Sequence, residues 1–180
     1  MQEENIRDIV ESAFRSSDSS GELFDALKLA ISYQFEDVAL YKILLGNPSL
    51  SKYELIMFTE KICKEFENCR YEIYLWAAQV FESRIGDQDF TEDALYFYEK
   101  AFLSSPEEHA PLTSALNLFN YEYEVPSNQS ILSLVNIGVA TVDKKSMVYR
   151  KLSEHFRKLG NKDLQAKYIK MAKLQQKRER

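Results

Sequence analysis

Apolar residues recur every three or four positions along almost the whole chain. This spacing places them on one face of an α-helix, whereas a half-buried strand needs strict alternation, which is sustained nowhere. The pattern therefore predicts an all-α protein of about ten helices. We expect them near residues 6–14, 23–31, 38–45, 53–66, 71–81, 91–104, 112–119, 131–138, 147–159 and 163–176.

Residues at the ends of these segments support the boundaries. Either Ser49 or Ser51 can act as the N-cap of the helix near 53–66. Gly46 can take a left-handed cap conformation just before Pro48, which cannot continue a helix. Pro106 ends the helix near 91–104 in the same way.

The predicted helices could form a globular bundle or a stack of helical hairpins. Segments that open at Glu72, Pro106 and Met147 lie about 34 to 41 residues apart, which is the range of helical-hairpin repeats. The spacing favours the stack.

One segment has the spacing of a known repeat. Ala94, Tyr98, Ala101 and Pro106 follow the pattern of the second helix of a tetratricopeptide repeat. Small residues on one stripe let two helices approach closely, an aromatic ring fills the gap to the next hairpin, and proline stops the helix. This segment resembles that family.

The residues before it resemble the first helix of the same repeat. Tyr74, Ala77, Ala78 and Phe81 have the required spacing, with Ala78 where the family prefers glycine. The turn over 82–93 is about four residues longer than the family pattern.

A second segment near the end of the sequence is also similar to this repeat, although Gln165 stands where the family has a small residue. Its matching residues are Tyr149, Leu152, Ser153, Phe156 and Gly160 in the first helix, then Ile169 and Ala172 in the second.

The resemblance implies antiparallel helical hairpins stacked as a short, right-handed, tetratricopeptide-like solenoid. We expect one helical-repeat domain over 1–180. It would hold divergent helices at 1–69, repeat-like hairpins at 71–106 and 147–176, and a basic tail at 177–180. The half-a-tetratricopeptide repeats of RNA-processing scaffolds are a sister possibility, but their tryptophan and arginine pattern is not supplied by Trp76 alone.

The resemblance also implies a scaffold that binds a peptide or helix of another protein in a concave groove. The first helices line that groove in such arrays, so the candidate partner-binding residues are those that we expect these helices to expose, namely Tyr74, Gln79, Arg84, Arg150 and Lys151. We interpret Phe81, Tyr98 and Phe156 as core packing. The supply of 11 Tyr leaves room for partner contacts as well.

Composition argues against an enzyme. The 2 His and 2 Cys are few for metal binding or nucleophilic catalysis, and His109 and His155 lie far apart in the sequence. Cys63 and Cys69 fall near opposite sides of one predicted helix, which favours neither a local disulfide nor a shared metal site. We interpret them as buried or idle thiols in a reducing cytoplasm. We expect no cofactor and no metal ion.

Charge is distributed unevenly. Residues 143–180 carry a net charge of +9, whereas the residues before them carry −14. A solvated capping helix would explain the lysines, but a nucleic-acid-associated protein acting through 143–180 is the alternative function. We expect a monomer at physiological salt, with association at low ionic strength.

No apolar run is long enough to span a membrane, and the acidic residues after Met1 do not fit a secretory signal. We therefore expect a cytoplasmic protein.

Overall fold

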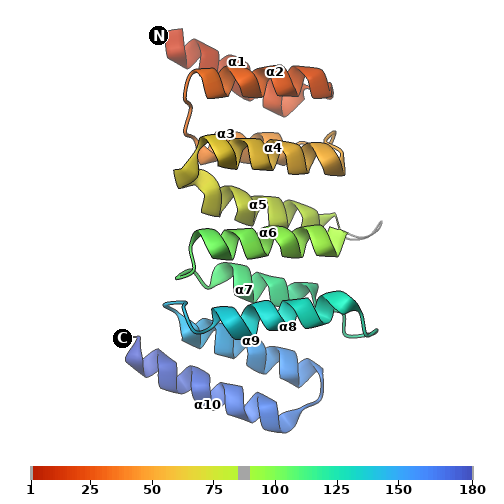
Figure 1. Ribbon diagram of the computed structural model, residues 1–180, viewed down its shortest axis with the longest axis vertical. Helices are drawn as coiled ribbons and strands as arrows, with labels where there is room; N and C mark the ends of the chain where they lie inside the picture. The colour runs from red at the N-terminus through yellow and green to blue at the C-terminus, as the bar shows by residue number, and fades with distance from the viewer. Residues whose placement is uncertain (1, 85–89, 180) are drawn as a thin grey trace. The chain divides into compact units, whose positions relative to one another are not determined.

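The computed structural model describes residues 2–84 and 90–179 (Figure 1). These residues form ten α-helices and two short 3-10 helices and contain no β-strand, which confirms the all-α prediction. The α-helices are α1 (Gln2–Ser16), α2 (Ser20–Ser32), α3 (Val38–Leu45), α4 (Lys52–Glu65), α5 (Arg70–Ser83), α6 (Phe90–Ser104), α7 (Ala110–Ala115), α8 (Pro126–Gly138), α9 (Lys145–Lys158) and α10 (Lys162–Arg178). The 3-10 helices are η1 (Glu67–Cys69) and η2 (Leu116–Leu118).

The chain divides into two compact units, Met1–Val80 and Phe81–Arg180. The division falls within α5, so the predicted hairpin over 71–106 has most of its first helix in unit 1 and its second helix in unit 2. A single repeat domain stays a prediction.

In unit 1, α1 packs against α2 and α3, and α3 packs against α4. Tyr41 is fully buried, stacks on Phe66 with 5.6 Å between ring centroids, and donates a hydrogen bond of 2.7 Å to the carbonyl of Phe35. Asp37 caps α3 and also accepts a hydrogen bond from Arg7 of α1. The Arg7 guanidinium lowers the pKa of the Asp37 carboxyl.

Two predicted boundaries in unit 1 have different outcomes. Ser51, rather than Ser49, is the N-cap of α4, where it forms a capping box with Glu54. The left-handed conformation expected for Gly46 is wrong, because its φ is −79°. The Gly46 N–H bonds to the carbonyl of Lys42 at 3.0 Å, so the chain completes an ordinary right-handed turn there.

In unit 2, α6 packs against α7 and α8, and α7 packs against α9. Phe81 stacks on Phe97 with 5.6 Å between centroids. Several of the predicted repeat-packing residues are buried, namely Ala78 in unit 1 and Phe81, Ala94, Tyr98 and Ala101 in unit 2. Pro106 is exposed just after α6. The role of these residues in a repeat stays a prediction.

Helices α9 and α10 pack side by side as a hairpin (Figure 1). Gly160 has a φ of +71°, its N–H bonds to Arg157, and the next N–H, of Asn161, bonds to the carbonyl of Phe156 at 2.9 Å. These two bonds form the Schellman motif that ends α9. The Asn161 side chain then caps α10 by accepting from the N–H of Leu164 at 3.0 Å.

The contact between these two helices is largely aromatic. Tyr168 of α10 stacks on half-buried Tyr149 and Phe156 of α9, with centroids 6.0 and 5.3 Å apart, and Leu152 and Ala172 are buried. α10 continues through Arg178, so Lys177 and Arg178 of the predicted tail are helical, whereas residue 180 lies outside the described residues. No described helix combines the length and the apolar character needed to cross a membrane.

Candidate functional site

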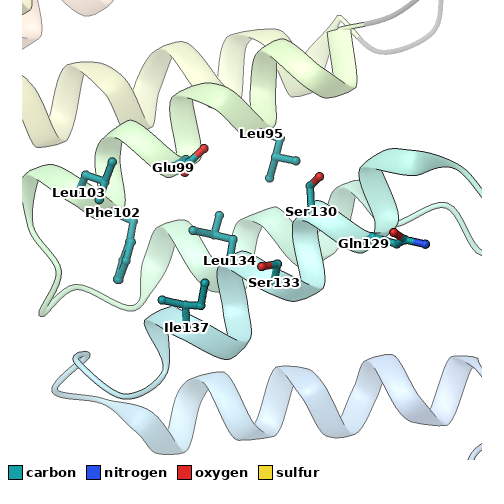
Figure 2. A pocket seen from close by; sticks show the side chains of 9 residues that line it. All are labelled: Leu95, Glu99, Phe102, Leu103, Gln129, Ser130, Ser133, Leu134 and Ile137. Carbon is teal, nitrogen blue, oxygen red and sulfur yellow. The ribbon is translucent and has the colours of Figure 1, made fainter.

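A groove between α6 and α8 of unit 2 is the candidate functional site (Figure 2). It has a volume of about 480 Å³, within the range of about 300–1,000 Å³ that is common for ligand sites. Its lining residues, which define the α6–α8 groove, are Leu95, Glu99, Phe102, Leu103, Gln129, Ser130, Ser133, Leu134 and Ile137.

Helix α6 uses two neighbouring faces. Ala94, Tyr98 and Ala101 lie on the buried face, whereas Leu95, Glu99 and Leu103 repeat every fourth residue on the face beside it. Leu103 is 67% exposed. One side of α6 therefore belongs to the core while the other is left open as one wall of the groove.

Helix α8 is divided in the same way. Ile131 and Val135 are fully buried, whereas Leu134 and Ile137 lie on the face that lines the groove, and Ile137 is 70% exposed. Figure 2 shows Leu95 extending from α6 toward α8 and Leu134 extending from α8 toward α6. The two walls thus present aliphatic side chains to the same hollow.

Gly138 brings the end of α8 close to its neighbours. A Cβ atom at this position would lie 2.8 Å from the methyl carbons of Leu112 and 3.0 Å from the ring of Phe102. Such distances are shorter than ordinary van der Waals contact, so the absent side chain is what lets α8 pack tightly on these two residues. Phe102, 6% exposed, forms part of the groove lining as well.

The groove is acidic where it is charged. Glu99 is the one charged residue among the nine that line it, and it is exposed. Ser130, Ser133 and Gln129 supply polar groups on α8. A ligand would therefore meet mainly aliphatic and aromatic carbon, with one carboxylate beside it.

A second hollow of unit 2 is more polar. It has a volume of about 650 Å³ and includes Glu82 and Glu92 together with residues of the segment after α7. Glu82 accepts a hydrogen bond from Tyr98, and burial together with this bond raises the pKa of the tyrosine hydroxyl. Asn128 bonds to the backbone of Asn120 at 2.8 and 2.9 Å. These contacts stabilise the local fold.

A hollow in unit 1 lies beside Trp76. Its two cations have partners: Arg15 pairs with Glu11 at 2.8 Å, and Lys42 pairs with Glu72 at 3.2 Å. Because both cations are paired with carboxylates, this hollow has little net positive charge to attract an anionic ligand.

His155 and the two cysteine side chains take structural positions. His155 is 1% exposed and lies 2.9 Å through Nδ1 from the hydroxyl of Tyr121. Cys63 and Cys69 are both buried free thiols, and burial raises the pKa of Cys69. Among the residues described, no group of three or more His, Cys, Asp or Glu side chains could hold a metal ion.

The partner-binding residues expected from the sequence lie elsewhere. None of Tyr74, Gln79, Arg84, Arg150 and Lys151 lines the α6–α8 groove. The expectation that Tyr74 is exposed is wrong: 8% of its surface is accessible, and its hydroxyl lies 3.4 Å from Glu60. Tyr74 is therefore a packing residue of unit 1.

The other four predicted residues are more accessible. Gln79 and Arg150 are exposed, and Arg84 and Lys151 are half-buried, with burial lowering the pKa of Arg84. Gln79 belongs to unit 1 and the other three belong to unit 2. Their role in binding stays a prediction.

The sequence of α8 contains more apolar positions than one core-facing stripe requires. In α8, Ile131 and Val135 lie on one stripe, but Leu134 and Ile137 widen the apolar surface beyond it. Apolar residues outside the stripe that packs the core mark a second face of the helix.

Comparisons with family models, curated proteins and solved structures find no match to this chain. The α6–α8 groove and the charges of the molecule are therefore the basis for its functional assignment.

Proposed function

We propose that this protein is a non-catalytic adaptor that binds an apolar helix or peptide of another protein in the α6–α8 groove. The observation that carries the proposal is the exposure of Leu103 and Ile137, 67% and 70%, on opposite walls of one hollow. Exposed aliphatic residues gathered around a groove are typical of interaction sites, whereas single ones are common on any surface.

The shape and charge of the groove favour one kind of ligand. Two helices bound it, so an amphipathic helix or an extended peptide can lie between them with its apolar side chains against Leu95, Leu134 and Ile137. A basic residue of the ligand would meet Glu99. We therefore propose a partner segment that is apolar on one face and carries Lys or Arg.

The lining residues also support a non-catalytic role. Ser130 and Ser133 are the hydroxyl groups of the groove, and its lining includes no His or Cys. A serine nucleophile needs an adjacent base, and no described hydrogen bond joins either hydroxyl to Glu99, the one carboxylate among the lining residues.

We further propose that the hairpins are divergent tetratricopeptide-like repeats. The support is the match between the family spacing and the α9–α10 hairpin, in which Gly160 adopts the left-handed turn between the helices. In this proposal the groove is a binding surface of a repeat scaffold.

Selection from a random peptide library displayed on phage tests the function. We expect wild-type protein to enrich peptides with apolar residues at helical spacing and a Lys or Arg. Selected peptides, labelled with fluorescein, should bind Leu103→Asp and Ile137→Asp more than tenfold more weakly, because each places a charge in the apolar groove. Both residues are mostly exposed, so the fold should survive.

Tyr53→Asp is the matched control, because Tyr53 is 78% exposed on α4 of unit 1 and lies outside the groove. It should leave peptide affinity unchanged, and Glu99→Lys should reverse the preference for basic peptides. Equal binding by Ile137→Asp and wild type, or enrichment of acidic peptides, would overturn the proposal.

A further inference from the structure

The outward side of α10 is a strongly basic surface separate from the groove. Its inward side is fixed by contacts with α9: Tyr168 stacks on Phe156 at 5.3 Å, Ala172 is buried, and Leu164, Met171 and Gln175 are half-buried. With 3.6 residues per turn, these residues cluster on one side of the helix.

Directly opposite lies a line of cations, which we name the lysine face. It consists of Lys162, Lys170, Lys173 and Lys177, with Ala166 among them, and all five residues are exposed. The four lysines fall within about 40° of one line along the helix and extend over about 22 Å of its length.

The charge of this face is not neutralised within the part of the chain that the structure describes. None of its four lysines forms an ion pair with a described carboxylate. Residues 145–178 hold 11 Lys or Arg and 2 acids, Glu154 and Asp163. The nearby Glu179 is engaged with Ser146 at the start of α9.

We propose that the lysine face binds the phosphate backbone of double-stranded nucleic acid without reading the base sequence. A duplex carries one negative charge per about 1.7 Å, so about 13 phosphate charges lie along the length of this face. Lysine attracts phosphate as a point charge, and no Asn, Gln or Arg on the face offers the paired hydrogen bonds that distinguish bases.

Three features of the surface favour a duplex over other polyanions. An interfacial membrane helix must bury one continuous apolar side in lipid. The apolar side of α10 that holds Tyr168 and Ala172 is packed on α9, and the exposed Ile169 and Leu174 lie about 140° apart on the helix. Protein interfaces are depleted of Lys and Ala and enriched in aromatic residues, whereas this face consists of four Lys and one Ala. Single-strand binders use aromatic rings to stack bases, and the face has none.

Fluorescence anisotropy with two fluorescein-labelled 20-base-pair DNA duplexes of unrelated sequence tests the proposal on the full chain. We expect equal affinity for both duplexes. The logarithm of the binding constant should fall with the logarithm of NaCl concentration with a slope of about −3.6, as four phosphate contacts require. A clear preference for one duplex, or no binding at 25 mM NaCl, would overturn the proposal.

Paired charge variants locate the surface. Lys170→Gln/Lys173→Gln should halve the salt slope, to about −1.8, and weaken binding at least tenfold. Lys61→Gln/Lys64→Gln changes the net charge equally but lies on α4 of unit 1, so it should leave the slope unchanged. Equal losses in the two variants would mean that overall charge, rather than the lysine face, attracts DNA.

Circular dichroism of both double variants should match wild type, because Lys170 and Lys173 are exposed and make no described ion pair. Tighter binding to a 20-nucleotide single strand than to either duplex would overturn the choice of a duplex. Binding to vesicles of 30% phosphatidylserine with no binding to DNA would identify a membrane surface instead.

Discussion

Glu179, just beyond the end of α10, accepts hydrogen bonds from both the backbone N–H and the hydroxyl of Ser146, in the first turn of α9. The N–H bond is 2.9 Å long. Ser146 is 5% exposed, and the residue at the N-cap position of α9, Lys144, makes no capping bond through its side chain. Glu179 thus supplies the negative charge that the N-terminal end of the α9 dipole favours. It also connects the end of α10 to the start of α9.

Glu179→Ala should lower the free energy of unfolding by about 1–2 kcal/mol, since it leaves two buried donors of Ser146 without an acceptor. Urea unfolding followed by circular dichroism measures the loss, and hydrogen exchange should rise in the first turn of α9. Glu154→Ala, an exposed position of α9, is the control and should change stability by less than about 0.5 kcal/mol. Equal effects would show that the Ser146 contact contributes little.

Gly138→Ala tests the close approach of α8 to Leu112 and Phe102. Alanine gains about 1 kcal/mol over glycine in a helix, but its Cβ would lie 2.8 Å from Leu112, and overpacking a core costs about 1–3 kcal/mol. We expect a net loss of about 1 kcal/mol in urea unfolding.

Gly21→Ala is the control for this substitution. Gly21 lies in the first turn of α2, where the nearest atom to an added Cβ is the Ser19 hydroxyl at 3.8 Å. The same change should therefore stabilise the protein slightly there. A gain in stability at Gly138 as well would mean that Leu112 moves aside at little cost.

Helices could be predicted from the sequence because their causes are local. The apolar spacing, the capping box at Ser51 and the glycine at 160 all act within a few residues of the helix that they shape. The α9–α10 hairpin was predicted for the same reason, since its turn is specified by Gly160 and Asn161.

The groove could not be predicted in this way, because it depends on how two helices about 35 residues apart in the sequence pack together. Ile137 belongs to the same apolar pattern as Ile131, yet Ile137 is 70% exposed and Ile131 is fully buried.

The wrong expectation for Tyr74 has a related cause. Helix α5 is apolar on most of its surface, with half-buried Leu75 and Trp76 beside buried Ile73 and Tyr74, so its spacing does not indicate which side faces solvent.

Gly160→Ala should destabilise the α9–α10 hairpin by about 1–2 kcal/mol, because a side chain at a φ of +71° clashes with the backbone. Gly160→Asn should cost less, since asparagine tolerates the left-handed region. Urea unfolding of the two variants gives the comparison. Beyond residue 160 and its two neighbours in the chain, an added Cβ meets no atom within 4 Å, so the cost comes from the backbone conformation alone. Equal costs for alanine and asparagine would contradict this cause.

His155 stands in an aromatic cluster of unit 2. Its ring meets those of Phe119 and Phe156 edge-on, with centroids 4.5 and 5.0 Å away, and its Nδ1 is in contact with the Tyr121 hydroxyl. Its Nε2 is buried and has no hydrogen-bond partner among the described residues. Burial lowers the pKa of His155, and the nearby Lys158 lowers it further.

This depressed pKa makes the folded state sensitive to mild acid. Above about pH 6.5, His155 is neutral in both the folded and the unfolded chain and contributes no pH dependence. As the pH falls below that value, the unfolded chain binds a proton that the folded chain does not, so the free energy of unfolding decreases until the pH passes the folded pKa. At pH 5.5, one unit below the pKa of an unfolded histidine, the loss is limited to about 1.4 kcal/mol. Urea unfolding at pH 7.5 and 5.5 measures it. His155→Phe, whose aromatic ring fits the cluster, should remove this pH dependence of the free energy of unfolding, and His109→Gln should retain it. If the free energy of unfolding of His155→Phe still decreases between pH 7.5 and 5.5, another group causes the pH dependence.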